Sequence, residues 1–286
     1  MQRKEKNIFS HFKMKPGELN IEGEPIKIGK SATESIAKAR HDFHQNKQRA
    51  SLKRLTPSGR THDITSVRIL TWNVDTLSRC LTKFLKLASD RKIDIALLQD
   101  TKILKDAPEF ATQQTFVGGK RLLSAKIQSG YTITTAIDKH LPVYATFVGP
   151  CCMTVVLDLV GVFLRITNIY APVSTNDEQK KVEIEKFWRK IEEHMKTSFV
   201  PGKPNFTIIG GDFNAQIGRD AELDGQIKKN LFHGVSNFSG RLIKNFVEKN
   251  NLNLPKSHRS SRISPPVPTF KTGAGQSEID FFLISN

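Results

Sequence analysis

The chain has 286 residues, 38% of them hydrophobic, and its 44 Lys+Arg against 28 Asp+Glu give a formal net charge of +16. This length suits one large domain or two small ones, and the charge favours a polyanionic partner, with nucleic acid ahead of an anionic membrane. The chain has only three cysteines, without metal-ligand spacing, which excludes a disulfide scaffold. It has no apolar run near ~18 residues, which excludes a membrane span, and "MQRKEKNIFS" lacks the features of a signal peptide, which excludes secretion. We therefore expect a nuclear or cytoplasmic protein.

Residues 1–65 are predicted to be a basic tail. They contain 14 Lys+Arg against 7 Asp+Glu and show no sustained apolar period. Such a segment buries too little apolar surface to offset the entropy of ordering, so we predict that it is mostly disordered. The stretch "SATESIAKARHDFHQNKQRASLKRL" can form a transient basic helix. The tail is therefore either a solvated segment or an arm that contacts phosphates.

From Val67 onward, β-rich runs alternate with amphipathic helical patterns. The expected strands are residues 67–74, 93–100, 131–137, 142–148, 153–160, 162–171, 205–214 and 277–285, and the expected helices are 77–92, 183–199 and 240–251. Strands interleave with helices but also follow one another directly. This order favours an α/β protein with the architecture of a four-layer α/β sandwich, in which two packed mixed β-sheets are flanked by helices.

The stretch "GGDFNAQIG" begins where the apolar strand "NFTII" ends. Residues i and i+2 of a strand project to the same side, so Asp212 and Asn214 can face one point in space. Gly210 and Gly211 remove bulk beside them, which would let a ligand approach the backbone closely. A carboxylate and a carboxamide suit the deprotonation and orientation of a water molecule. An Asx-type turn without chemistry gives the same pattern and stays open at this point.

Other predicted strands also end on polar side chains. Asn73 and Asp75 end "TWNVDTL", Asp100 follows the apolar run "IALLQ", and Tyr170 precedes the proline of "IYAPVS". Asp280 lies inside the apolar strand "SEIDFFLI", where a carboxylate without partners would be costly. Catalytic groups of sheet enzymes commonly lie on such loops over a rigid scaffold. Several acids without cysteine or paired histidine favour a hard cation, Mg²⁺ or Mn²⁺, over zinc.

Six segments, taken in order, resemble the endonuclease/exonuclease/phosphatase superfamily, which includes apurinic/apyrimidinic endonucleases and deoxyribonuclease I. The segments are "RILTWNVDTL", "IDIALLQDTK", "ITNIYAPVS", "TIIGGDFNAQIG", "GRLIKNFVEKNNLNL" and "PTFKTGAGQSEIDFFLIS". Their order and wording are most similar to the endonuclease domains of LINE-type retrotransposons. The resemblance covers residues 66–286 and leaves the tail, residues 1–65, outside it.

The resemblance implies a divalent-metal-dependent phosphodiesterase that cuts DNA. Asp100, Asp75 and Asn73 would hold Mg²⁺ or Mn²⁺, with Asn73 and Asp75 also helping to hold the phosphate. The family carries Gln-Glu where this chain carries Gln99-Asp100. Aspartate is one methylene shorter, and a Mg²⁺ ligand must lie at about 2.0–2.1 Å, so we expect the metal to shift, to bind through water or to bind weakly.

The resemblance also implies the roles of the remaining strand-end residues. Asp212 would activate or hold the attacking water, Asn214 would orient it, and Tyr170 would contact the phosphate near the leaving oxygen. Asp280 would hold and polarise a catalytic histidine of a final Ser-Asp-His strand, which this sequence lacks; His258, in the loop "LPKSHRSSR", is interpreted as a loop residue. A positioned histidine contributes ~10²–10⁴-fold in rate, so we expect impaired activity in a chain truncated at the C-terminus, with its last strand missing.

Three functions remain open on the sequence. The first is the DNA endonuclease, with a reverse transcriptase downstream in an intact polyprotein and with no obligate protein partner evident. The second is a catalytically dead remnant that still binds nucleic acid through its basic surface. The third keeps the fold but acts as a superfamily phosphatase or RNA nuclease, on an RNA end or a phosphorylated lipid head group.

Overall fold

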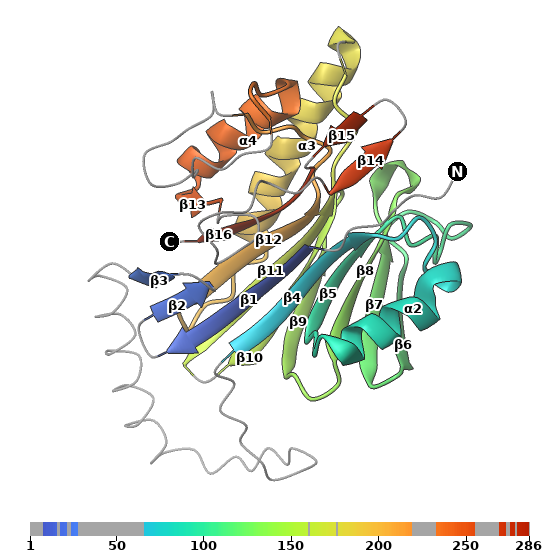
Figure 1. Ribbon diagram of the computed structural model, residues 1–286, viewed down its shortest axis with the longest axis vertical. Coiled ribbons are helices and arrows are strands. Elements are labelled where there is room, and N and C mark those ends of the chain that lie inside the picture. The colour runs from blue at the N-terminus through green and yellow to red at the C-terminus, as the bar shows by residue number, and fades with distance from the viewer. Residues whose placement is uncertain are drawn as a thin grey trace.

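The computed structural model describes residues 8–15, 18–21, 24–27, 66–159, 161–175, 177–218, 233–254, 269–272, 275–277 and 279–285. Within these ranges, two mixed β-sheets pack face to face between helices, so the expected α/β sandwich is confirmed. Figure 1 shows α2 on one side of the paired sheets and α3 and α4 on the other.

The first sheet has, among the described residues, eight strands in the order β3-β2-β1-β4-β5-β8-β7-β6. These strands are β1 (Ile8–Lys15), β2 (Glu18–Ile21), β3 (Glu24–Lys27), β4 (Ser66–Asn73), β5 (Ile95–Gln99), β6 (Thr112–Val117), β7 (Lys120–Lys126) and β8 (Thr132–Asp138). β4 and β5 run parallel, whereas the flanking pairs β1·β4 and β5·β8 run antiparallel. The parallel pair therefore brings the carboxyl ends of β4 and β5 to the same edge.

The second sheet has six strands in the described part of the chain, in the order β13-β16-β12-β11-β10-β9. These strands are β9 (Val143–Val148), β10 (Cys152–Leu159), β11 (Val162–Tyr170), β12 (Asn205–Asp212), β13 (Leu252–Asn253) and β16 (Asp280–Ser285). β11 and β12 run parallel, and β16 returns antiparallel to β12. β14 (Phe270–Thr272) and β15 (Gly275–Ser277) pair separately as a short antiparallel ribbon.

The helices are amphipathic and cover the outer faces of the sheets. They are α2 (Leu77–Asp90), α3 (Glu178–Thr197) and α4 (Phe238–Lys249), with a short 3₁₀ turn η1 (Gln128–Gly130). α3 begins at Asp177, whose carboxylate accepts the backbone N–H of Gln179 at 2.9 Å. α4 begins at Asn237, whose side-chain oxygen accepts the N–H of Gly240 at 2.9 Å. These N-caps satisfy backbone donors that have no partner within the helix.

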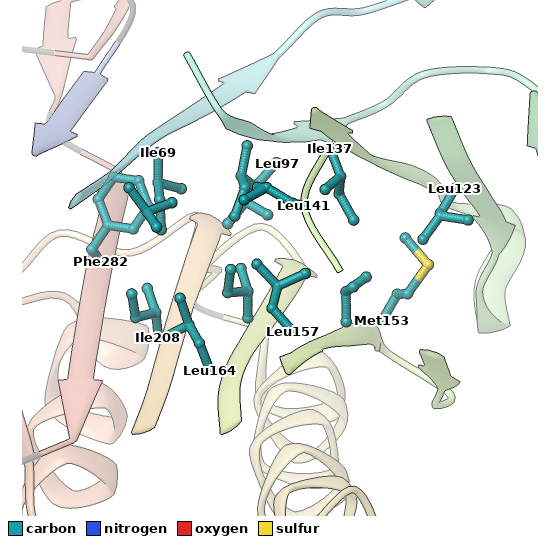
Figure 2. Packing of buried hydrophobic residues seen from close by; sticks show 14 of the residues in the cluster. Ile69, Leu97, Leu123, Ile137, Leu141, Met153, Leu157, Leu164, Ile208 and Phe282 are labelled. Atoms are coloured by element: carbon teal, nitrogen blue, oxygen red, sulfur yellow. The ribbon is translucent and has the colours of Figure 1, made fainter. Parts of the chain in front are cut away.

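The largest core lies between the two sheets. Ile69, Leu97 and Ile137 of the first sheet meet Leu164 and Ile208 of the second, all of them almost fully buried. Figure 2 shows these side chains pointing from both sheets into the shared space. Two further clusters fill the space between α2 and the first sheet and between the second sheet and the pair α3 and α4. This stacking of layers holds the edges of the two sheets in a fixed relative position.

Several features differ from the sequence-based expectations. β6 and β7 were not among the expected strands. In β6 no apolar alternation marks the strand, and every residue from Thr112 to Phe116 is exposed. β1, β2 and β3 lie within residues 1–65; the division between a mostly disordered tail and a domain that starts at residue 66 stays a prediction. His258, which was interpreted as a loop residue, lies outside the described residues. No helix in the described ranges has the length and apolarity needed to span a membrane.

Candidate functional site

The predicted site residues gather where two parallel strand pairs end. In the first sheet Asn73 lies beside Gln99, at the ends of β4 and β5. In the second sheet Tyr170 lies beside Asp212, at the ends of β11 and β12. Parallel neighbours end at the same edge, and the two sheets are packed face to face. The fold therefore brings four strand ends together at one lip of the sandwich.

Most of these residues continue the inward-facing column of their strand. Residues at even spacing along a strand lie on one face. Asn73 follows the core residue Ile69 by four positions, and Asp212 follows Ile208 by the same spacing. The same spacing relates Tyr170 to Ile166 in β11 and Asp280 to Ile284 in β16. The inward-facing residues of each strand therefore form the apolar core along most of the strand and place polar groups at the edge where the parallel strands end.

A hydrogen bond joins the two sheets at this rim. The side-chain nitrogen Nδ2 of Asn73 donates to Oδ2 of Asp212 across 2.8 Å. Asp212 is only 4% exposed, and burying a carboxylate costs free energy unless donors such as this one pair with it. The other oxygen, Oδ1, accepts the backbone N–H of Asn214 at 3.0 Å. These two donors fix the orientation of the carboxylate.

Tyr170 lies against the same groups. Burial raises the pKa of its phenol well above its usual value, and the charges of Asp100 and Asp212 raise that pKa further, while a side-chain hydrogen bond with Asn73 opposes them. The ring also meets Tyr131 edge-on, with centroids 4.7 Å apart. The hydroxyl therefore stays protonated and remains a hydrogen-bond donor beside two carboxylates.

Asp75 and Asp100 are joined by a residue that the sequence did not single out. Nζ of Lys102 lies 2.7 Å from Oδ1 of Asp75 and 3.8 Å from Oδ2 of Asp100. The side-chain hydrogen bond to Asp75 is the main reason that the pKa of Lys102 is raised. Asp100 also acts electrostatically on Tyr170, which links the Asp75–Lys102 pair to the rim formed by Asn73 and Asp212.

Backbone conformation helps to place these groups. Asp75, Asp100, Lys102 and Asn214 all have positive φ, between 46° and 54°. Asp and Asn adopt this left-handed region more readily than other non-glycine residues, but it still costs about 1–3 kcal/mol and persists only where surrounding contacts hold it. At Lys102 the contact is direct, because its backbone N–H donates to Oγ1 of the buried Thr132 at 2.7 Å.

Asn214 and Asp280 occupy different parts of the site from Asp75 and Asp100. Asn214 forms the Asx-type contact with Asp212, and its Nδ2 donates to the carbonyl oxygen of Ala171 at 2.7 Å. The turn left open by the sequence is thus present, and it ties the end of β12 to the loop after β11. Asp280 is 9% exposed and lies directly opposite Asp212 in the β12·β16 register. Its backbone N–H donates to Oγ1 of Thr269 at 3.2 Å.

The glycines before Asp212 serve packing, which corrects the expectation that they admit a ligand. A β-carbon on Gly210 would lie 2.7 Å from Leu97 of the opposite sheet and from the Phe282 ring. A β-carbon on Gly211, whose φ is +150°, would lie 2.1 Å from the carbonyl oxygen of Ile169. The pair therefore permits close approach of neighbouring chain segments.

The site offers a small set of oxygen donors to a divalent cation. No group of three or more His, Cys, Asp or Glu side chains that could hold a metal occurs among the described residues. Mg²⁺, however, is usually held by one or two carboxylates together with waters and substrate phosphates. Asp75 and Asp100, which share one ammonium group, supply such a pair of oxygen donors. Oδ1 of Asn73 already accepts the N–H of Asp75 at 3.3 Å, so its metal role stays a prediction.

Lys102 and Thr132 are the site residues that the sequence did not reveal. Lys102 follows Asp100 by two positions, but in a loop this spacing gives no direction for its side chain. Thr132 lies thirty residues away from Lys102 and reaches it only through the order of strands in the first sheet. The only sequence signal for either was the position of the Lys102 loop directly after a predicted metal ligand.

No protein-family model matches the sequence, and no curated protein matches it significantly. The structure is similar to an AP endonuclease, LMAP, from Leishmania major, with 16% identity, a TM-score of 0.53 and coverage of 76% of this chain and 78% of that one. It is similar to the 3'-5' exonuclease NExo from Neisseria meningitidis, with 19% identity, a TM-score of 0.51 and coverage of 76% and 86%.

A third similar structure is the endonuclease domain of TRAS1, a telomere-specific non-LTR retrotransposon, with 16% identity, a TM-score of 0.49 and coverage of 75% and 82%. The exonuclease NExo also appears bound to a product DNA hairpin, in a structure described as a 3' phosphatase. At these identities the likeness concerns the fold. The chain therefore has the fold of the endonuclease/exonuclease/phosphatase proteins.

Proposed function

We propose that this protein is a divalent-metal-dependent phosphodiesterase that hydrolyses DNA. The observation that carries the proposal is the 2.8 Å hydrogen bond between Asn73 and Asp212, because it joins an oriented, buried carboxylate to the other sheet. Tyr170 lies against both residues, and the acidic pair Asp75 and Asp100 lies nearby. A buried base, a protonated donor and a pair of metal-binding acids are the parts that phosphodiester hydrolysis requires.

Asp212 is the proposed general base. Its carboxylate would take a proton from a water molecule that attacks phosphorus, and Asn73 would hold it in the orientation that accepts this proton. Asn214 would act through the turn that fixes the second carboxylate oxygen. Tyr170, with its pKa raised, would donate a hydrogen bond to a phosphate oxygen beside the leaving group. Asp280, which lies opposite Asp212, would hold a further proton-carrying group at the same rim.

Asp75 and Asp100 are the proposed holders of Mg²⁺ or Mn²⁺, with Asn73 as a further candidate. A bound divalent ion would neutralise charge on the phosphate in the transition state. Lys102 already bridges these two carboxylates, so the ion would enter where one positive charge is present. The shorter Asp100, in place of the family's glutamate, supports weaker metal binding than the family shows.

DNA is the proposed substrate, with the nucleus or cytosol as the expected compartment. The formal net charge of +16 favours a polyanion, and one similar protein is bound to a DNA hairpin. The order of the sequence motifs further supports an endonuclease of the LINE retrotransposon type, with a reverse transcriptase as its partner in a longer polyprotein. An RNA end or a phosphorylated lipid head group has the same phosphate chemistry, and competition with plasmid DNA distinguishes these substrates.

The test is nicking of supercoiled plasmid in Mg²⁺ or Mn²⁺, with EDTA as the metal-free arm. Asp212→Asn keeps the size of the side chain but removes the base, so we expect its rate to fall by ~10²–10⁴-fold. Asn73→Ala should also slow the reaction, whereas Asp106→Asn, at an exposed loop aspartate, should not. Equal nicking by Asp212→Asn, or nicking unaffected by EDTA, would contradict the proposal. Salt-sensitive DNA binding without turnover would instead identify a non-catalytic binding protein.

A further inference from the structure

A cluster of polar side chains lies inside the core between the sheets, one layer below the site. Gln99 and Asn168 are 0% exposed and Thr71 is 1% exposed. Thr135, which is 0% exposed, borders this cluster, with its Oγ1 3.5 Å from Nδ2 of Asn168. Thr71 and Asn168 precede Asn73 and Tyr170 by two positions, so they lie in the same inward-facing columns. Their neighbours below are the apolar side chains shown in Figure 2, such as Leu97, Leu164 and Ile208. A polar layer therefore separates the apolar core from the site.

Gln99 connects this layer across the two sheets. Its Nε2 donates to Oδ1 of Asn168 in the second sheet across 2.8 Å. The same nitrogen lies 3.0 Å from the carbonyl oxygen of Leu97 and 3.2 Å from Oγ1 of Thr71. Gln99 thus links β4, β5 and β11 through one carboxamide.

Asn168 completes the link from the other side. Its Nδ2 lies 3.1 Å from the carbonyl oxygen of Thr134 and 3.3 Å from that of Leu98. Leu98 and Thr134 are directly opposite each other in the β5·β8 register. One side chain of the second sheet is therefore anchored on a single cross-strand pair of the first sheet. A shift of one sheet along the other would break these bonds together.

The hydrogen bonds of this layer fix the relative position of the two sheets more closely than apolar packing can. Apolar contact is non-directional, and buried polar groups cost free energy unless all of them find partners. Apolar side chains of the same shape would fill this space at little or no cost in stability. The polar layer instead restricts the two sheets to one register, in the layer next to the Asn73–Asp212 hydrogen bond. That bond tolerates only a few tenths of an ångström in donor–acceptor distance.

We propose that Thr71, Gln99 and Asn168 are positioning residues, which lock the register of the two sheets so that Asn73 meets Asp212. The inference rests on the proposed function, because the lock matters to catalysis only if Asp212 acts in it. A positioning role and a purely structural role predict different results, because only a positioning role allows activity to fall while stability is kept. Replacing the two carboxamides of the layer with apolar side chains of similar volume should preserve folding but impair the site.

The test compares Gln99→Met/Asn168→Leu, which removes both carboxamides at similar volume, with the wild-type chain. Thr154→Val/Thr167→Val is the control, because these hydroxyls form a buried 2.7 Å pair on the face of the second sheet that packs against α3. Three properties are measured for each protein: cooperative thermal unfolding, the kcat and KM for plasmid nicking, and the NMR signal of the Asn73 side-chain amide. That signal is observed in protein labelled with ¹⁵N-asparagine and assigned with Asn73→Ser.

We expect the Gln99→Met/Asn168→Leu variant to unfold cooperatively near the wild-type temperature, with kcat lower by roughly 10- to 100-fold and KM within about threefold. Its Asn73 amide signal should move towards that of an unbonded amide, whereas the control should match the wild type in kcat and in this signal. A folded variant with wild-type kcat and an unchanged Asn73 signal would overturn the inference.

A single-residue comparison covers the case in which the double variant does not fold. Thr71→Val keeps the Gln99–Asn168 bond but removes the hydroxyl, and should lower kcat by about three- to tenfold, while Thr71→Ser should restore it. Equal kcat values for Val and Ser at this position would overturn the inference. If the wild-type chain does not nick DNA, the proposed function fails, and the Asn73 amide signal alone decides whether the lock exists.

Discussion

Lys102 donates a hydrogen bond from Nζ to Oδ1 of Asp75 across 2.7 Å, although the two residues lie in different loops of the first sheet. The ammonium group stands where a cation held by Asp75 and Asp100 would also be attracted. Removing its charge should therefore strengthen the binding of a divalent ion. At an exposed site the effect is modest, since water and salt screen the repulsion.

The first prediction is that Lys102→Gln lowers the Mn²⁺ concentration for half-maximal nicking by roughly three- to tenfold. The measurement is a metal titration of plasmid nicking at low ionic strength, repeated at high salt, where the difference should shrink. Lys105→Gln, at an exposed lysine of the same loop, is the matched control and should leave the titration unchanged. A higher Mn²⁺ requirement in Lys102→Gln would show that the ammonium supports the site in another way.

The second prediction concerns Tyr170. Replacement with Phe removes a hydroxyl whose pKa is raised by burial and by Asp100 and Asp212, so the loss should be that of a neutral donor. We expect kcat to fall by roughly 10²-fold with little change in KM. Because the wild-type phenol stays protonated, its deprotonation should not reduce activity below about pH 10. Tyr144→Phe, at an exposed tyrosine of β9, should behave as wild type; an equal loss there would contradict the assignment.

The third prediction concerns the paired glycines of β12. Gly211→Ala should destabilise the fold strongly. Its φ of +150° disfavours any other residue, and the added β-carbon would lie 2.1 Å from the carbonyl oxygen of Ile169. The backbone strain alone costs roughly 1–3 kcal/mol. Gly210→Ala should cost about 1–3 kcal/mol by overpacking against Leu97 and Phe282. Thermal and urea unfolding measure both, with Gly234→Ala, which has open space around it, as a neutral control.

The fourth prediction is a dependence of stability on acidic pH through His194. Burial, and secondarily the charge of Arg165, lower the pKa of this imidazole from 6.5 to about 4, and its Nε2 lies 2.8 Å from Oγ1 of Thr154. The unfolded chain thus takes up the proton first as pH falls. The neutral imidazole therefore contributes about 3 kcal/mol to the free energy of unfolding above about pH 6.5, and this contribution is lost as the pH falls from there to 4.

Urea unfolding from pH 7.5 to 4 tests this prediction for His194. The variant His194→Gln keeps a hydrogen-bonding group next to Thr154 but cannot titrate in this range. The difference in unfolding free energy between the wild type and this variant should therefore change with pH. A constant difference would show that the imidazole of His194 does not titrate differently in the folded and unfolded states.

The fifth prediction concerns the thiols. Cys151 and Cys152 are buried, and burial raises the pKa of Cys151 to about 11, so neither should react quickly as a thiolate. Cys80 is only partly buried. Ellman's reagent should therefore titrate one thiol in the native protein and all three after unfolding. Cys80→Ser should abolish the native reaction, and a rapid native reaction in that variant would contradict the burial of the pair.

The central strands, and the strand ends at which several candidate site residues lie, were predictable because one pattern encodes both. In β4, β11 and β12 the alternation that marks inward-facing core residues runs on to Asn73, Tyr170 and Asp212 at the strand ends. Parallel neighbours then bring those ends to one edge. The position of a residue along such a strand therefore predicts both the face and the end at which its side chain lies.

The remaining features depend on contacts between distant segments. β6 is exposed along most of its length, so no apolar alternation marks it. Lys102 lies in a loop, where sequence gives no side-chain direction, and its place depends on Thr132 from another strand. The glycines at 210 and 211 gave a correct signal of close approach, but not of what approaches, because that depends on which strands are neighbours.

The shared inward columns also limit how such a protein can change over time. Inserting or deleting one residue inside β12 would reverse the facing of every side chain beyond that point, moving Asp212 outward and a core side chain into the vacated place. The fold and the proposed site would be lost together, so evolution by small steps cannot change the length of these strands. Variation in length is left to the segments past the strand ends, where it does not change the placement of Asn73, Tyr170 and Asp212.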